Sequence, residues 1–517
     1  MTDPAQIGGV VLSLEGITKR FGALLANDAV DLTLHKGEIL ALLGENGAGK
    51  TTLMNILFGH YVPELGLVRV ADDSGTLHTL PNGSSGAALA AGVGMVHQHF
   101  TLAENLGGLD NIVLGTEPVW RPFRNPALAR RRIEGLMAES GLTVDLRVQV
   151  ANLTVGEKQR IEILKALYRD VRVLILDEPT AVLTPQEADG LFVVLRRLAA
   201  NGLGVIFISH KLGEVLAVSN RIVVLRGGRK VGEMPTAAAD RRAIADLMVG
   251  RAVEQPKRTR PTPGAPVLEF DRVTLKRGSL RQSLTELSFT VRAGEIVGLA
   301  GVSGNGQSAI AALVCGLATP QGGVLRLYGK PVVGADPRGL VAAGVARMPE
   351  DRQHDGVVGA MTVAENIAIE DLRDAAYQRM GFLNFRAITA RAEAAIAAYD
   401  IRCPGPHAEA RLLSGGNLQK LILARVLERN PRLILANQPT RGLDVGAQAD
   451  VHRRLIAARD AGAAVLVISE DLDELFALAD RFLVAHGGDV TDAGSSETLD
   501  RQTVGLMMAG QRSEAAA

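Results

Sequence analysis

The 517-residue sequence has little of several features that mark particular classes of protein. Its two cysteines, Cys315 and Cys403, are too few for a disulfide framework in a chain of this size, so we expect a reducing compartment. Lysine plus arginine equals aspartate plus glutamate at 56 each, which argues against nucleic acid as a partner. No uncharged apolar run reaches the roughly 18 to 20 residues that span a bilayer, and no basic segment followed by an apolar core opens the sequence, so we expect neither a membrane span nor a secretory signal.

The sequence does contain an internal repeat with a period of about 250 to 260 residues. The paired segments are GEILALLG at 37–44 with GEIVGLAG at 294–301, AGVGMVHQ at 91–98 with AGVARMPE at 343–350, LILDEPTAVL at 174–183 with LILANQPTRGL from Leu433, and DLMVGR at 246–251 with LMMAGQ at 506–511. A period this long is typical of a duplicated domain and too long for a solenoid repeat.

We therefore predict two domains, at 1–251 and 267–511, followed by a short tail at 512–517. Between the domains lies AVEQPKRTRPTPGAP, residues 252–266, whose prolines and charges are typical of an exposed linker.

Each copy alternates short apolar runs with helical stretches. RVLILD at 172–177 and GVIFISH at 204–210 have the composition of buried parallel strands, and EKQRIEILKALY at 157–168 has the pattern of a helix. This alternation predicts an α/β fold with helices on both faces of the sheet. Ligands of such sheets bind at the carboxyl ends of the strands.

A glycine-rich phosphate loop, GENGAGKT at 44–51, lies between the apolar ILALL and the helical TLMNILFG. Glycines let consecutive backbone amides face phosphates, while Lys50 neutralises the β and γ oxygens and Thr51 can ligate Mg²⁺. The residues predicted to bind nucleotide here are Gly44, Glu45, Asn46, Gly47, Ala48, Gly49, Lys50, Thr51 and Thr52.

Polar side chains follow three further predicted strands of the first copy. Asp177 and Glu178 end VLILDEP, where Asp177 can hold Mg²⁺ and Glu178 can act as general base on a water molecule. Gln98 ends GMVHQ and His210 ends VIFISH, and each can reach a γ-phosphate or the attacking water. We predict Glu178, His210 and Gln98 as catalytic residues, with Thr51, Gln98 and Asp177 as metal ligands.

LTVGEKQR at 153–160 and LSGGNLQK at 413–420 each precede a predicted helix and lie about 20 residues before the acidic strand end. They resemble the signature of ATP-binding-cassette (ABC) ATPases, and the resemblance covers nearly the whole chain, twice. It implies two tandem P-loop NTPase domains, each with a RecA-like α/β core, an antiparallel β subdomain and a helical signature subdomain. ATP and Mg²⁺ are the implied cofactors.

The resemblance also implies that two cassettes dimerise head to tail, so that ATP on the loop of one is completed by the signature of the other. The first loop would then face Ser414, Gly415 and Gly416, and Asp444 of RGLDV would join the same site. Phe21 in KRFG resembles the aromatic platform that stacks on adenine.

The second copy has lost the residues that carry the chemistry. The substituted pairs are Lys50 with Gln307, Gln98 with Glu350, Asp177 with Asn437, Glu178 with Gln438, and His210 with Glu470. Its loop would face LTVGE, in which Val155 replaces a glycine, and Thr184 takes the place of Asp444. The departures thus gather in one composite site, and we predict that the other site alone hydrolyses ATP.

Tandem cassettes with an intact first site, together with PEDR at 349–352 and ANQPTRGLDVGA in the second copy, resemble the ATPase subunit of bacterial importers for nucleosides and simple sugars. The first copy is most similar to the nucleoside branch. The resemblance implies two transmembrane permease subunits, an extracytoplasmic solute-binding lipoprotein, and a peripheral place on the cytoplasmic face of the inner membrane. The alternatives are a ribose or galactose importer ATPase and a tandem cassette protein without a transport role, such as a ribosome-associated factor.

Overall fold

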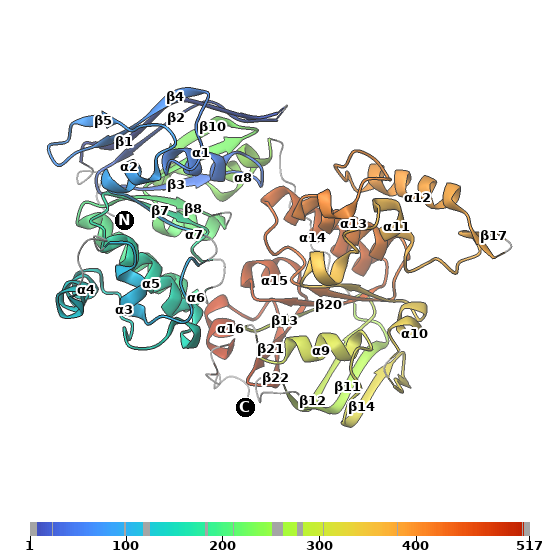
Figure 1. Cartoon of the computed structure of the whole chain (residues 1–517). Coiled ribbons are helices and arrows are strands. Elements are labelled where there is room, and N and C mark those ends of the chain that lie inside the picture. The colour runs from blue at the N-terminus through green and yellow to red at the C-terminus, as the bar shows by residue number, and fades with distance from the viewer. Residues whose placement is uncertain are drawn as a thin grey trace. The chain divides into compact units, whose positions relative to one another are not determined.

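The computed structural model describes residues 8–22, 24–97, 100–116, 125–180, 183, 185–209, 211–250, 262–276, 283–302, 304–334, 336–379, 381–508 and 510. The chain divides into two compact units, unit 1 (residues 1–253 with 444–446) and unit 2 (residues 254–443 with 447–517). Each unit contains a six-stranded sheet, a four-stranded sheet and surrounding helices (Figure 1). The limits of the linker stay a prediction.

The six-stranded sheet of unit 1 has the spatial order β10-β9-β3-β8-β7-β6. Its strands are β3 (Ile39–Leu43), β6 (Val93–Val96), β7 (Val173–Asp177), β8 (Gly204–Ile208), β9 (Arg221–Arg226) and β10 (Arg229–Pro235). All neighbours run parallel except β10, which pairs antiparallel at the edge. Every residue of β3 and β8 is buried, as expected for central strands covered on both faces.

The amino-terminal part of unit 1 forms a four-stranded antiparallel sheet of order β2-β1-β4-β5. Its strands are β1 (Val10–Phe21), β2 (Leu24–His35), β4 (Leu65–Ala71) and β5 (Leu77–Thr79). Leu12 and Leu14 alternate with polar residues along β1, so one face of this sheet is apolar. That face joins one hydrophobic cluster with Leu53 and Met54 of the helix α1 (Lys50–Leu57).

The helices of unit 1 are α1 (Lys50–Leu57), α2 (Ser85–Ala90), α3 (Gly108–Val113), α4 (Pro126–Ser140), α5 (Val155–Leu167), α6 (Pro185–Ala200), α7 (Leu212–Val218) and α8 (Arg241–Val249). Three of them, α3, α4 and α5, gather in a helical subdomain (Figure 1). Ile112, Ile133 and Ile161, one from each helix, are fully buried in the same cluster. The signature segment begins α5, so the helical subdomain presents the signature at a helix amino terminus.

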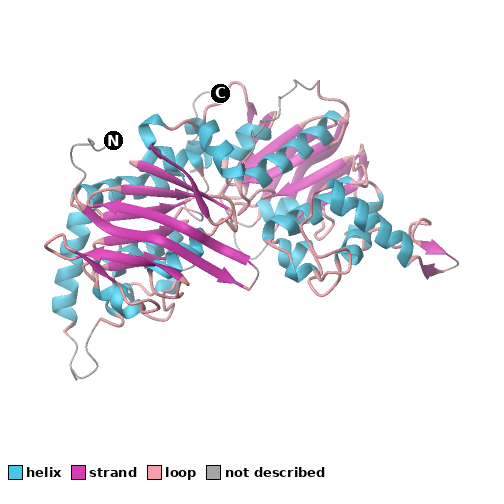
Figure 2. Cartoon of the chain, turned by 90° about the horizontal axis from the view of Figure 1, so that it is seen from above, coloured by secondary structure: helices cyan, strands magenta, loops and turns pink. Residues whose placement is uncertain are grey.

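Unit 2 repeats this plan, with sheets of order β16-β19-β20-β13-β21-β22 and β12-β11-β14-β15. Its strands are β11 (Pro266–Leu275), β12 (Leu284–Arg292), β13 (Ile296–Ala300), β14 (Gly322–Leu327), β15 (Lys330–Pro331), β16 (Val345–Met348), β19 (Leu433–Asn437), β20 (Ala464–Ser469), β21 (Arg481–His486) and β22 (Asp489–Ser495). A hairpin with no counterpart among the described residues of unit 1, β17 (Gln378–Arg379) and β18 (Phe382–Leu383), extends beyond the helices around it (Figure 2).

The helices of unit 2 are α9 (Gln307–Val314), α10 (Pro337–Ala342), α11 (Val363–Ala368), α12 (Phe385–Ala398), α13 (Gly415–Leu427), α14 (Val445–Asp460), α15 (Leu472–Leu478) and α16 (Arg501–Met508). Three-residue 3₁₀ helices lie at Val150–Asn152, Thr236–Ala238 and Ala410–Leu412, and a short π-helix lies at Arg352–Gly356. Both units thus confirm the predicted fold class, an α/β core with an antiparallel β subdomain and a helical subdomain. None of the helices in the described ranges is both long and apolar enough to cross a membrane.

Candidate functional site

The phosphate loop joins buried β3 to α1 and closes around the side chain of Lys50. Lys50 is 9% exposed, and its Nζ donates hydrogen bonds to the main-chain oxygens of Gly44 (2.7 Å) and Glu45 (3.0 Å). Gly49 has φ +97°, and a Cβ there would lie 2.2 Å from the main-chain oxygen of Ala26. Only glycine fits at this position, because the loop packs directly against the backbone of β2.

The structure brings Lys50 together with the acidic pair at the end of β7. Burial lowers the pKa of Lys50, while the nearby charges of Glu178 and Asp177 oppose that change. Burial and the charge of Glu178 raise the pKa of Asp177, and Lys50 opposes this. The loop cation and both carboxylates therefore share one partly desolvated site at the carboxyl ends of the strands.

The backbone at Glu178 is held in a left-handed conformation. Its φ is +48°, and its amide donates a hydrogen bond of 2.9 Å to the main-chain oxygen of Ile208 on β8. The turns after both strands are tied to Glu214 of α7, which accepts hydrogen bonds from Thr180 (2.5 Å) and Ser209 (3.1 Å). Glu214 could not be identified from the sequence, because its contacts join two strand ends that are distant in the sequence.

Tyr61, Lys19 and Asn27 also lie at this site, and the sequence did not indicate them. Tyr61, just beyond α1, contacts the predicted platform Phe21 edge to face with ring centroids 5.5 Å apart, and both rings are exposed. Lys19 places its Nζ 5.2 Å from the centroid of the Phe21 ring. Asn27, fully buried on β2, donates a hydrogen bond of 3.2 Å from Nδ2 to the main-chain oxygen of Gly49.

Of the other predicted residues in unit 1, Gln98 and His210 lie outside the described residues. Thr51 and Asn46 are exposed and Ala48 is buried. Asp444 lies half-buried in the turn before α14.

The signature of unit 2 leaves the amino terminus of α13 open. Ser414 caps this helix without a side-chain hydrogen bond to its backbone, and its hydroxyl accepts one from Nδ2 of Asn417 at 2.9 Å. A Cβ on Gly415 or Gly416 would meet nothing within 4 Å. The prediction that the signature precedes this helix was wrong, because the helix begins inside the signature at Gly415. Free amides at a helix amino terminus, approachable at two glycines, suit an anionic ligand.

The signature of unit 1 is closed by its own side chains. Thr154 and Glu157 form a capping box at the start of α5, in which the Thr154 hydroxyl accepts from the Glu157 amide at 3.3 Å. A Cβ on Gly156 would lie 2.4 Å from Oε1 of Glu187. The carboxylates of Glu157 and Glu187 thus lie at the start of α5, where a bound phosphate would need hydrogen-bond donors and space.

The strand-end turn of unit 2 keeps the scaffold of unit 1 without its carboxylates. Gln438 has φ +50°, its amide donates to the main-chain oxygen of Ile468 at 2.7 Å, and Thr440 and Ser469 both donate to Glu474. Glu350 forms an ion pair of 2.6 Å with Arg441.

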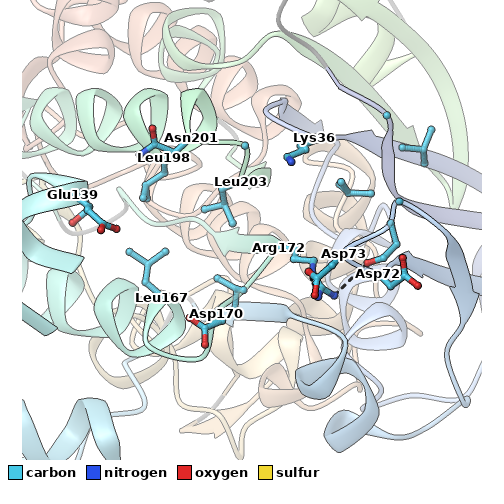
Figure 3. A pocket seen from close by; sticks show the side chains of 18 of the residues that line it. Lys36, Asp72, Asp73, Glu139, Leu167, Asp170, Arg172, Leu198, Asn201 and Leu203 are labelled. Atoms are coloured by element: carbon cyan, nitrogen blue, oxygen red, sulfur yellow. Dashed lines mark hydrogen bonds and ion pairs between the residues drawn. The ribbon is translucent and has the colours of Figure 1, made fainter. Parts of the chain in front are cut away.

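A cavity of about 450 Å³ in unit 1 is a separate feature (Figure 3). It lies at the amino ends of β7 and β8, among Lys36, Asp73, Glu139, Arg172 and Leu203. It contains none of the predicted site residues, because nucleotide-type sites of such sheets lie at the opposite, carboxyl ends of the strands.

Two phosphate-loop domains with paired signatures define a tandem ATP-binding-cassette protein. The family model described as ABC transporter matches residues 27–181 and 284–441, and the chain belongs to this family of ATPases.

The chain is similar over almost its whole length to proteins of known role. It is 44% identical to the glucose import ATP-binding protein TsgD13 of Haloferax volcanii, with 96% of each chain covered. It is 43% identical to the nucleoside import ATP-binding protein NupA of Lactococcus lactis, covering 97% of this chain and 98% of the relative. An archaeal ribosome recycling factor has a similar fold, with a TM-score of 0.62, 19% identity, and coverage of 92% of this chain and 90% of that one. At that identity the likeness concerns the fold alone.

Proposed function

We propose that this chain is the ATP-hydrolysing subunit of an importer for nucleosides or simple sugars, with one competent nucleotide site. The observation that carries the proposal is the asymmetry of complementary parts. The phosphate loop with Lys50 and the acidic pair at the end of β7 are in unit 1. The open signature with Gly415 and Gly416 is in unit 2.

At the competent site, the loop amides and Lys50 bind the β- and γ-phosphates of ATP, and Phe21 stacks on adenine. Glu178 orients a water molecule for attack on the γ-phosphorus and takes its proton, after which ADP and phosphate leave. Gln98 and His210 assist around the γ-phosphate. The fixed turn at Glu178 supports this role, because a general base works only within hydrogen-bond reach of its proton.

Mg²⁺ fits the donors at this site. Thr51, Asp177 and Gln98 offer only oxygen ligands, which Mg²⁺ prefers together with water and phosphate oxygens. Burial and the neighbouring Glu178 raise the pKa of Asp177, so a divalent cation beside it would favour its ionised form. When bound, Mg²⁺ would neutralise charge on the β- and γ-phosphates.

In the ATP-bound state, the signature of unit 2 is proposed to complete the competent site that the phosphate loop of unit 1 begins. Ser414, Gly415 and Gly416 present the amide groups at the start of α13 to the γ-phosphate, and Asp444 joins them. The other combination, the loop with Gln307 and the signature with Glu157, lacks a cation and adds negative charge, so it does not hydrolyse ATP.

ATP-driven closing and opening of the cassettes would drive transport through two separate permease subunits, with an extracytoplasmic solute-binding protein delivering the solute. This chain would then lie on the cytoplasmic face of the membrane through the permeases. The names of the relatives support both a nucleoside and a sugar, and among these we favour a nucleoside from the resemblance of the first copy.

The test is reconstitution of the tagged chain with the permease and solute-binding subunits that co-purify with it from membranes. The solute-binding protein is loaded in turn with nucleosides, ribose, galactose and glucose. Phosphate release in proteoliposomes should rise several-fold with one of these solutes. If the chain co-purifies with ribosomes and no solute stimulates its ATPase activity, the importer proposal is wrong.

A further inference from the structure

The second phosphate loop keeps the backbone of the first. It follows β13, of which every residue is buried, and α9 begins at Gln307 as α1 begins at Lys50. Gly304 and Gly306 have φ +90° and +101°, close to the +83° and +97° of their counterparts in unit 1. The loop therefore has the shape of a phosphate site, and the side chain of Gln307 is what differs inside it.

The side-chain amide of Gln307 fills this loop. It is 7% exposed, and its Nε2 donates a hydrogen bond of 2.9 Å to the main-chain oxygen of Val302. Its Oε1 accepts a hydrogen bond of 3.0 Å from the backbone amide of Asn305. A Cβ on Gly301 would lie only 2.5 Å from Nε2, so the amide packs tightly against the start of the loop.

The comparison with unit 1 shows which half of this amide matters. Nε2 replaces Lys50 Nζ, which donates to Glu45, the counterpart of Val302. No side-chain atom of Lys50 corresponds to Oε1 of Gln307. In unit 1 the amide of Ala48, the counterpart of Asn305, donates instead to the main-chain oxygen of Glu45. Gln307 thus brings into the loop an acceptor oxygen, which is the chemistry that a phosphate itself would bring, and it brings no positive charge.

We propose that Gln307 is the lock of the second loop: its side chain occupies the loop and excludes nucleoside triphosphates, and this one residue decides between binding and exclusion. The inference rests on the proposed function, in which the loop of unit 1 binds ATP. Gln307→Lys would free the Asn305 amide and direct an ammonium group to the main-chain oxygen of Val302. Ser308, which is exposed, would lie beside the phosphates. Binding should follow, but not hydrolysis, because Asn437 and Gln438 are not carboxylates.

The first experiment counts nucleotides bound to the purified full chain by equilibrium dialysis with a non-hydrolysable ATP analogue and Mg²⁺. We expect one per wild-type chain, two for Gln307→Lys, and one for the double variant Lys50→Ala with Gln307→Lys. Two nucleotides bound to the wild type, or no additional nucleotide bound to Gln307→Lys, would overturn the proposal that Gln307 excludes nucleotide. A wild type that binds none would contradict the proposed function, and the gain in Gln307→Lys would still decide the lock.

The second experiment measures hydrogen exchange at the Asn305 amide without nucleotide. Gln307→Ala removes the acceptor, so exchange at Asn305 should speed up about tenfold or more. The matched control is Lys50→Ala, in which the Ala48 amide keeps its backbone acceptor and its exchange should stay as in the wild type. Melting curves verify that each variant folds. Unchanged exchange at Asn305 would overturn the proposal independently of any nucleotide count.

Discussion

The turns after β7 and β19 have the same backbone and different chemistry. Glu178 and Gln438 both occupy the left-handed region, with φ +48° and +50°, and both amides bond to an isoleucine of the neighbouring strand. A conformation that costs about 1–3 kcal/mol persists in unit 2 although its carboxylate is gone. The strained turn therefore belongs to the scaffold, and the side chain at its tip can change without altering it.

The networks beneath these turns explain why the scaffold persists. Thr180 and Ser209 donate to Glu214, and Thr440 and Ser469 donate to Glu474, in the same arrangement. Glu474 is 4% exposed, so losing a donor would leave a buried carboxylate short of partners. Folding thus constrains the network in both units, whereas the side chain at the tip of the turn differs between them.

The largest effect is expected from changing that tip in unit 1. Glu178→Gln keeps the turn and the loop, as Gln438 does in unit 2, but removes the base, so phosphate release should fall about 100-fold to 10,000-fold. Binding of the ATP analogue should change less than threefold. Near-normal hydrolysis would mean that Glu178 is not the base.

Its matched control is Gln438→Glu, which places the same carboxylate on the same turn of unit 2. We expect no added activity, because Gln307 and Asn437 remain. A doubled rate of phosphate release in this variant would contradict the asymmetry of the two units.

The next effect concerns the two signatures. Gly416→Asp adds an anion at the open start of α13 without a steric clash, since a Cβ there meets nothing, and should lower hydrolysis by about 100-fold with an unchanged melting temperature. Gly156→Asp, in the signature of unit 1, should keep more than a third of the activity but melt a few degrees lower, because its Cβ meets Glu187. The reverse ranking in activity would show that each unit works with its own signature.

A third pair of changes should affect both units alike. Arg221 holds buried Glu38 through hydrogen bonds of 2.7 and 3.0 Å, and Arg481 holds buried Glu295 in the same way at 2.9 Å. Arg221→Met or Arg481→Met removes the guanidinium partner of a buried carboxylate, which keeps its hydrogen bonds from His35 or from the Arg292 amide, and should cost about 3 kcal/mol. Calorimetry should show the melting of the altered unit lowered by roughly 6–12 °C in both cases. A large loss in one unit only would contradict equal scaffolds.

Acidification tests the same ion pair in unit 1. Burial opposes the charge of Glu38, but the hydrogen bonds from Arg221 and the His35 amide outweigh it and lower the pKa of this carboxyl. The pair's stabilisation is therefore complete above the ordinary carboxyl pKa and is lost as the pH falls through the lowered value. The melting difference between wild type and Arg221→Met should shrink below about pH 4, and a constant difference would show that Glu38 is not the cause.

The sequence predicted the parts of the site that are local patterns. The loop around Lys50 and the acids at the end of β7 lie at strand ends, and both signatures lie at helix starts, although each helix begins inside its signature and not after it. The closure of the first signature was also readable: Thr154 and Glu157 have the spacing of a capping box.

Contacts between distant segments could not be predicted in this way. Tyr61 meets Phe21 only because the end of β1 lies beside the segment after α1, and Glu214 joins two strand ends from a separate helix. No spacing rule relates such residues, since the sheet order that brings them together is set by packing of the whole unit.

The smallest effect is expected at Asn27, which supports the loop from behind. Its Nδ2 bonds to Gly49, but its Oδ1 is buried without a partner in the part of the chain that the structure describes, so the net gain to folding is small. Leu284 fills the equivalent place in unit 2 and is fully buried. Asn27→Leu should therefore change the melting temperature by less than about 3 °C.

Nucleotide binding should respond more than folding in the Asn27→Leu variant. The oxygen of Gly49 loses its donor, and the loop's last turn before Lys50 becomes free to shift, so affinity for the ATP analogue should fall about three- to tenfold, the worth of one hydrogen bond. The control Leu284→Asn buries an amide in unit 2 and should lower stability without changing that affinity. Equal affinity in wild type and Asn27→Leu would show that the loop holds its shape through its glycines alone. In that case the loss of Asn27 in unit 2 would be unrelated to the loss of nucleotide chemistry there.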